Sequence, residues 1–247
     1  LMKQIYTDED KSESTFKSRF RTVALLSCIF QQRKEYAEEI QLLKRESDFT
    51  KSLLPAHEDE YSKLVQALAQ VLLLSGKPTE ALARLNDLED TVHKYDETLD
   101  TDAEAMMVYC LAKEHQTERL AQSLNSLIQH RKSLPADKLK AYWWAFAASL
   151  DALKEEAKEG AFTNLIGFIS TGFNQRLELK TPAPVFLVRV IHKLNSAGEV
   201  KLAKKLEKRA LKRLDERNSQ IFNNHIMDEE SKEEPPFDLQ TTRLQIP

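Results

Sequence analysis

The stretch Tyr61–Tyr95, YSKLVQALAQVLLLSGKPTEALARLNDLEDTVHKY, decides the fold of this chain. Its apolar residues recur with a period of 3.6 on both sides of the short segment Ser75–Pro78, which predicts two antiparallel helices joined by a tight turn. Gly76 can adopt the left-handed conformation that ends a helix, and Pro78 suits the first turn of the next one. The predicted buried stripes are Leu64, Val65, Leu68, Val71 and Leu72 in the first helix, and Ala81, Leu82, Leu85, Leu88 and Val92 in the second.

A single hairpin of this kind cannot bury both apolar stripes, so it needs neighbours that are built in the same way. The spacing of apolar residues from Thr15 to Arg217 predicts about ten helices in five antiparallel pairs, and no segment alternates as a strand would. We therefore expect an all-α fold, a right-handed superhelix (solenoid) of about five helix hairpins.

Three details of this prediction concern the ends of helices. The second helix is expected to begin at about Lys34. The segment Ser47–Glu58, which carries Pro55, is expected to be a break between helices. Gly160 is expected to mark the turn within the fourth pair.

The charge distribution suggests three regions: a polar lead-in over 1–14, helical repeats over 15–217, and an acidic, proline-containing tail over 218–247. The segment Lys201–Arg217 contains eight Lys or Arg and three Asp or Glu, whereas Asp228–Glu234 contains five acids and one base. One hypothesis is that this acidic segment folds back on the basic helix. The alternatives are a solvated helix followed by a disordered tail, and a basic helix that binds nucleic acid.

The hairpin is repeated at a distance of 39 residues, where Leu85 corresponds to Leu124 and Leu88 to Leu127. The turn resembles the tetratricopeptide repeat (TPR), which has a glycine in the turn, an alanine five residues on and a large apolar residue four further. Gly76, Ala81 and Leu85 occupy those positions here. In the next pair His115 replaces the glycine and Leu120 replaces the alanine, so the series is irregular. The resemblance implies a protein that holds a peptide or a partner helix on a concave surface.

Composition gives no sign of a membrane protein or of a nucleic-acid-binding protein. The formal charge is −3, and the chain has no apolar run near the roughly 18–20 residues of a membrane span. Cys28 and Cys110 are far apart in predicted helices, which indicates free thiols in a reducing compartment and therefore a cytoplasmic protein.

Motifs that carry catalysis are missing from the sequence. The Gly76-Lys77 pair lacks the preceding glycine of a phosphate-binding loop, and His57 begins His-Glu-Asp-Glu without a second histidine at metalloprotease spacing. The six histidines are dispersed, and two cysteines cannot build a structural zinc site. We expect no enzymatic activity, no cofactor and no metal.

Two sets of residues are candidates for binding a partner. Long polar side chains and one aromatic ring on the first helices of successive hairpins suit hydrogen bonding to an extended peptide, although an ordinary solvated face would have the same composition. The adjacent pair Trp143-Trp144 is either core or a candidate anchor for a partner, because tryptophan is enriched at the centres of interfaces. The predicted groove residues are Lys63, Gln66, Gln70, Leu73, Tyr109 and Lys113.

The sequence thus predicts a non-enzymatic scaffold that binds another protein, and self-association stays open because end hairpins expose apolar faces. The alternative is the regulatory or output region of a larger signalling protein or transcription regulator, such as one with a receiver domain upstream. The polar lead-in and the abrupt start of the chain motivate that alternative. An enzyme hidden in a helical fold would need convergent His, Asp or Glu side chains in a cleft.

Overall fold

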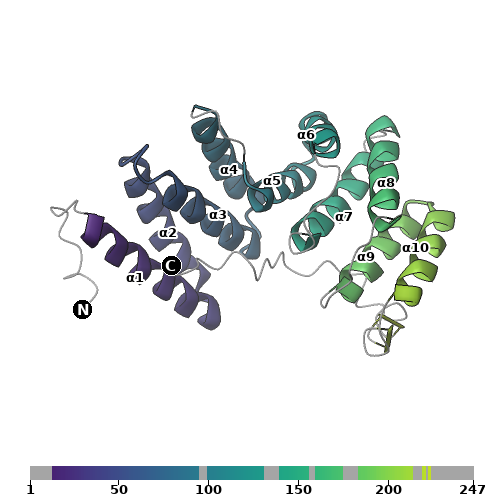
Figure 1. The fold of residues 1–247 in the computed structure, drawn as a ribbon, viewed down its shortest axis with the longest axis horizontal. Coiled ribbons are helices and arrows are strands. Elements are labelled where there is room, and N and C mark those ends of the chain that lie inside the picture. Colours follow the sequence, from purple (N-terminus) through teal and green to yellow (C-terminus); the bar gives the residue numbers. More distant parts are fainter. Residues whose placement is uncertain are drawn as a thin grey trace. The chain divides into compact units, whose positions relative to one another are not determined.

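The computed structural model describes residues 13–94, 99–130, 139–155, 159–174, 183–213, 219–220 and 222–223 (Figure 1). Over these ranges the regular structure is helical and contains no strand, which confirms the predicted all-α class. The main elements are α1 (Glu13–Arg33), α2 (Tyr36–Lys51), α3 (Glu58–Leu74), α4 (Pro78–His93), α5 (Thr101–Lys113), α6 (Thr117–His130), α7 (Leu139–Glu155), α8 (Glu159–Asn174), α9 (Ala183–Ser196) and α10 (Val200–Arg213).

The helices form two compact units, and the boundary between them lies within α4, after Leu88. In the first unit α2 packs against both α1 and α3. Polar bonds connect its elements as well. Tyr61 of α3 donates its hydroxyl to the Asp87 carboxylate of α4 at 3.0 Å, and Lys51 at the end of α2 lies 2.5 Å from the same carboxylate. Arg84 of α4 pairs with Asp48 of α2 at 2.8 Å.

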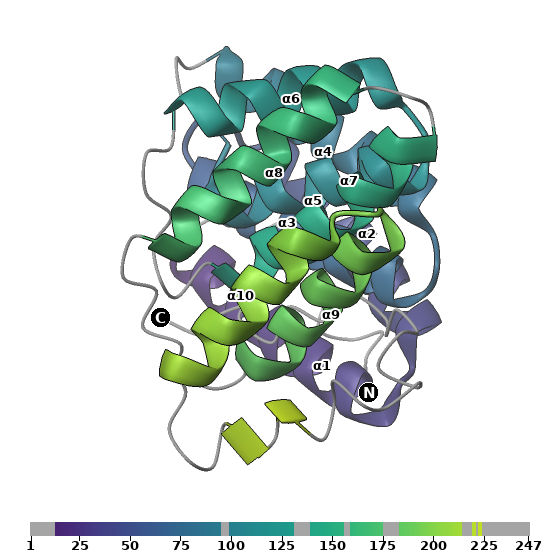
Figure 2. The ribbon, with the colours of Figure 1, turned by 90° about the vertical axis from the view of Figure 1, so that its right-hand side faces the viewer.

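The second unit is a stack of two rows of helices. The first helices of successive hairpins, α5, α7 and α9, contact one another in chain order, and so do the second helices, α6, α8 and α10. Within each hairpin the two helices also pack together: α5 against α6, α7 against α8, and α9 against α10. Figure 2 shows α9 and α10 side by side. This stacking buries the apolar stripe of each hairpin against its neighbours, as the repeat pattern predicts.

The same turn ends four of the helices. Its central residue has a positive φ, and the next residue donates its backbone N–H to a carbonyl five residues earlier, which is the Schellman arrangement of a helix C-terminus. The central residues are Lys34 (φ 58°), Gly76 (φ 69°), His115 (φ 50°) and Gly198 (φ 84°). The N–H groups of Glu35, Lys77, Gln116 and Glu199 donate to the carbonyls of Phe30, Leu72, Leu111 and Leu194 at 2.9, 2.9, 3.0 and 2.8 Å.

Each of these turns also starts the following helix in the same register. The residue after the central one accepts the first backbone bond of that helix, from the N–H group four positions on. Those four donors lie on the buried face, and none of them is exposed to solvent. They are Glu39, Ala81, Leu120 and Ala203, so a carboxylate in the first hairpin takes the position of a small or apolar residue in the others.

The turn explains the displacement of one predicted boundary and confirms another prediction. The helix expected to begin at about Lys34 begins two residues later, at Tyr36, because Lys34 is the left-handed central residue of the first turn. The substitution of His115 for the turn glycine is confirmed as a replacement within an unchanged turn.

The break expected over Ser47–Glu58 is partly wrong, since α2 continues to Lys51 and only residues 52–57 form the connection. The buried face of α2 continues through Glu46, Ser47 and Thr50, all within 2% of full burial. Because these residues are polar, an apolar periodicity could not detect the last turn of the helix. The turn expected at Gly160 is wrong as well, because Gly160 is the second residue of α8.

Candidate functional site

The predicted groove residues of α3 lie on a helix that is buried over most of its circumference. Gln66, Gln70 and Leu73 are 5%, 3% and 6% exposed, and the Gln66 amide donates to the Ser62 hydroxyl at 3.1 Å. Lys63, in contrast, is exposed. The side chain that α3 offers to a partner within this set is therefore that of Lys63.

The predicted groove residues of α5 belong to the second unit and form a local pair. The Tyr109 ring is 7% exposed, and the ammonium group of Lys113 lies 5.5 Å from its centroid, within the range of a cation–π contact. Lys113 itself is exposed. Tyr109 thus holds a lysine over its ring, and the lysine is the accessible member of the pair.

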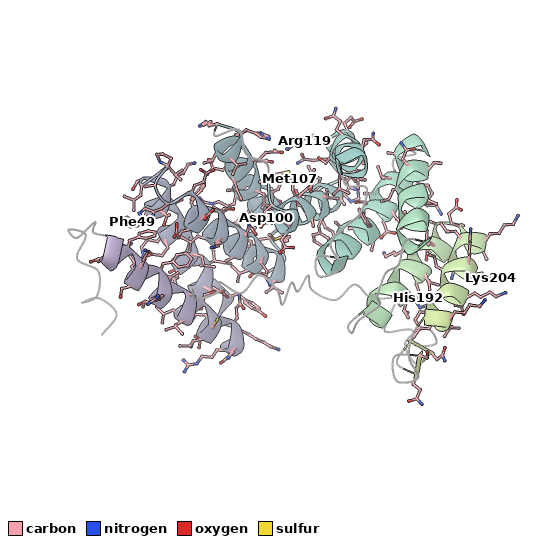
Figure 3. All side chains as sticks on the ribbon, viewed as in Figure 1. Phe49, Asp100, Met107, Arg119, His192 and Lys204 are labelled. Atoms are coloured by element: carbon pink, nitrogen blue, oxygen red, sulfur yellow. The ribbon has the colours of Figure 1, made fainter. Side chains whose placement is uncertain are left out.

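The common turn relates these residues to two that the sequence prediction missed. Gln70 and Tyr109 each lie six residues before the central residue of a turn, and so do Cys28 and His192, both of which are half-buried. His192 on α9 is labelled in Figure 3. The sequence could have identified Cys28 and His192, because each lies six residues before a turn residue. Finding them required recognising that Lys34, like Gly198, is the central residue of a turn.

The tryptophan pair Trp143-Trp144 lies on α7, and its side chains are outside the described residues. Its role as an anchor stays a prediction.

Two buried carboxylates in the first unit were not predicted as special. Glu46 is almost fully buried and forms an ion pair with Arg19 of α1 at 2.6 Å, and the Arg19 guanidinium lies 3.8 Å from the centroid of the Phe49 ring. This pair connects α1 to α2 through charge-assisted bonds in a site screened from water.

The second carboxylate, Glu39, has no positively charged partner among the described residues. One of its oxygens, Oε1, accepts from the Ser27 hydroxyl at 2.5 Å and from the Gln31 amide at 2.9 Å, while Oε2 is buried without a hydrogen-bond partner in the described part of the chain. Burial raises the pKa of Glu39, and the two donated bonds oppose that shift. Both bonds connect α1 to α2, so this carboxylate has a structural role in the first hairpin.

The described residues offer no assembled metal centre. No group of three His, Cys, Asp or Glu side chains among them could hold a metal ion. Burial raises the pKa of the Cys110 thiol to about 12, so this thiol is protonated near neutral pH and is a poor nucleophile. None of the described helices has the length and apolar character needed to cross a membrane.

Comparison with known proteins identifies the fold. No family model matches the chain, and no curated protein matches it in sequence. Among solved structures, the chain is similar to a variant form of a Podosopora anserina protein described as a kinesin light chain with nearly identical TPR-like repeats. The identity is 14% and the TM-score 0.57, with 79% of this chain and 96% of that chain covered. A second structure of the same repeats gives 13% identity and a TM-score of 0.55, with 78% and 93% covered.

This chain therefore has a TPR-like helical-repeat fold. The predicted family resemblance is confirmed at the level of the fold. At these identities the similarity establishes nothing about partners.

Proposed function

We propose that this chain is a non-enzymatic scaffold that binds a peptide or a partner helix on a concave helical-repeat surface. The predicted groove residues are Lys63, Gln66, Gln70 and Leu73 on α3 of the first unit, where Lys63 is the exposed one, and Tyr109 and Lys113 on α5 of the second unit, where Lys113 is the exposed one. The proposal extends to the organisation of the chain, with a repeat region over 15–217 and flanking segments over 1–14 and 218–247, and to action in the cytoplasm, in keeping with two free thiols.

The observation that carries the proposal is the fourfold recurrence of one turn in one register. A constant backbone brings a different side chain to the same position of four hairpins, namely Cys28, Gln70, Tyr109 and His192. Helical-repeat proteins present extended concave surfaces whose geometry is fixed by the repeats. Gln70 and Tyr109 are themselves nearly buried, so the side chains that a partner can reach are the exposed ones beside them. The exposed lysines near two of these positions, Lys63 and Lys113, suit a partner segment with acidic side chains or carbonyl groups at its surface.

Affinity capture with the full 247-residue chain tests the proposal. The groove variant carries Lys63→Glu and Lys113→Glu, which alter exposed side chains and leave the buried glutamines intact. A matched control carries Lys44→Glu and Lys94→Glu, two exposed lysines outside the predicted groove, with one from each unit as in the groove variant.

The proposal predicts that proteins captured by the native chain and by the control are lost from the groove variant. Identical sets of proteins for all three chains would contradict it. Circular dichroism of each variant verifies that the helical fold is retained.

A further inference from the structure

Helix α10 displays a stripe of five exposed lysines, called the lysine stripe below. With 100° between successive residues of a helix, the five lie within an arc of about 100° and extend over about 16 Å of the helix axis. Figure 3 shows Lys204 of this stripe pointing outward from α10. The stripe consists of Lys201, Lys204, Lys205, Lys208 and Lys212.

The positive charge of the lysine stripe is not neutralised by the described residues. None of the five ammonium groups forms an ion pair or a hydrogen bond within the described part of the chain. The carboxylate of Glu207 belongs to the same helix but lies about 60° outside the arc. The opposite face of α10 contains Ala203 and Leu206, both fully buried, and α10 packs against α9. The fold therefore uses the apolar face and leaves the lysines available to a partner.

Apolar side chains border the lysine stripe on one edge. Four large hydrophobic residues are strongly exposed in the described part of the chain, and two of them, Val200 and Leu211, are on α10 at 44% and 39% exposure. Measured around the helix axis, Leu211 and Val200 lie about 20° and 40° beyond Lys204, outside the arc of the lysines. The exposed face of α10 is therefore a cationic stripe with an apolar border.

The chemistry of this face points to a particular partner. Lysine ammonium groups are compact, strongly hydrated charges that lack the planar fork with which arginine grips individual carboxylates or phosphates. Protein interfaces commonly depend on buried aromatic anchors, and single-stranded nucleic acids require aromatic platforms, whereas the sequence of α10 contains no aromatic residue. Clustered lysines on an amphipathic helix suit the diffuse negative charge of a lipid surface, and a few apolar residues can enter its headgroup region.

We propose that the lysine stripe of α10 docks this chain on the surface of an anionic lipid bilayer. The contact is peripheral, because the main apolar face of α10 is already used against α9. Overall composition did not predict it, since the net charge of the chain is −3 and the positive charge is local to one helix.

Vesicle co-sedimentation with the full chain tests this proposal. The probes are vesicles of pure phosphatidylcholine and vesicles in which phosphatidylserine replaces a third of it, in 50 mM salt. We expect binding only to the anionic vesicles and its loss in 1 M salt, where the screening length falls to about 3 Å. Each lysine near such a surface strengthens binding about fivefold, so Lys204→Gln, Lys205→Gln and Lys208→Gln together should weaken it about a hundredfold.

A control variant removes the same amount of positive charge, three lysines, at positions outside the lysine stripe. It carries Lys44→Gln, Lys77→Gln and Lys94→Gln, at exposed positions outside α10, and should bind as the native chain does. The proposal is overturned if the native chain ignores anionic vesicles, or if the two variants bind equally.

The acidic segment Asp228–Glu234 is the competing occupant of the lysine stripe, and carbodiimide cross-linking distinguishes it from lipid. Cross-links between this segment and the stripe that persist when anionic vesicles are added would assign the stripe to the chain itself and overturn the proposal. Cross-links that are absent, or that the vesicles abolish, agree with it.

Discussion

The recurring turn makes a quantitative prediction about glycine substitutions in the first unit. Lys34 and Gly76 occupy the same turn position with φ values of 58° and 69°. A residue with a Cβ atom in this left-handed region costs roughly 1–2 kcal/mol, whereas exchanging glycine for such a residue gains about 0.4–1 kcal/mol by restricting the unfolded chain. The difference, about 0.5–1 kcal/mol, should favour glycine at both positions.

Lys34→Gly should therefore stabilise the first unit by about 0.5–1 kcal/mol, and Gly76→Ala should destabilise it by a similar amount. A Cβ atom built on Gly76 meets no other atom within 4 Å, so the cost at that position comes from the backbone conformation alone. Urea unfolding followed by circular dichroism measures both changes as shifts of the midpoint at constant slope.

Gly167→Ala provides a control with the opposite sign. Gly167 lies within α8, its φ is outside the left-handed region, and its added Cβ also meets nothing within 4 Å. The same substitution should stabilise a helix there by about 0.5–1 kcal/mol. If Gly76→Ala were neutral or stabilising, or if Lys34→Gly were destabilising, the argument from the common turn would be refuted.

Four further predictions concern single side chains. Because burial raises the pKa of Glu39, the contribution of Glu39 to stability falls as the pH rises above about 4.5, the ordinary pKa of this carboxyl. Glu39→Gln should remove that contribution, so the stability of the variant relative to the native chain increases from pH 4.5 to 7 in urea titrations. Tyr61→Phe removes the bond to Asp87 and should cost about 1 kcal/mol in the same assay. The Asp100 carboxylate caps α5 by accepting hydrogen bonds from two backbone N–H groups, so Asp100→Ala should lower the stability of the second unit by about 0.5–2 kcal/mol. Leu85→Ala should cost about 2–5 kcal/mol in the thermal or urea transition of the first unit, because Leu85 is fully buried.

Much of the fold could be predicted from the sequence because its strongest signals are local. The apolar stripes around Leu68 and Leu85 and the turn at Gly76 each identify one hairpin without information from elsewhere in the chain. The first hairpin was harder to predict because it contains a lysine at the left-handed position and a glutamate at the buried position, where the pattern requires glycine and alanine. Tertiary packing overrides both local preferences there.

The candidate site was less predictable for a physical reason. Helix periodicity assigns residues to a face, but whether a neighbouring element covers that face is a property of the whole structure. Gln66 and Gln70 are polar and nevertheless buried, whereas Lys63 on the same helix is exposed. For the lysine stripe the difficulty was the opposite. Its positive charge was visible in the sequence, but only the structure shows that no acidic side chain among the described residues pairs with it.

The central claim is that the faces bearing Lys63 and Lys113 bind a partner segment. The most direct measurement is the dissociation constant of a captured partner segment, carrying a fluorescent label, by anisotropy against the native chain, the groove variant and its matched control. We predict that Lys63→Glu with Lys113→Glu weakens binding at least tenfold, a loss of about 1.4 kcal/mol, while Lys44→Glu with Lys94→Glu leaves it unchanged. Equal dissociation constants for all three chains would contradict the claim.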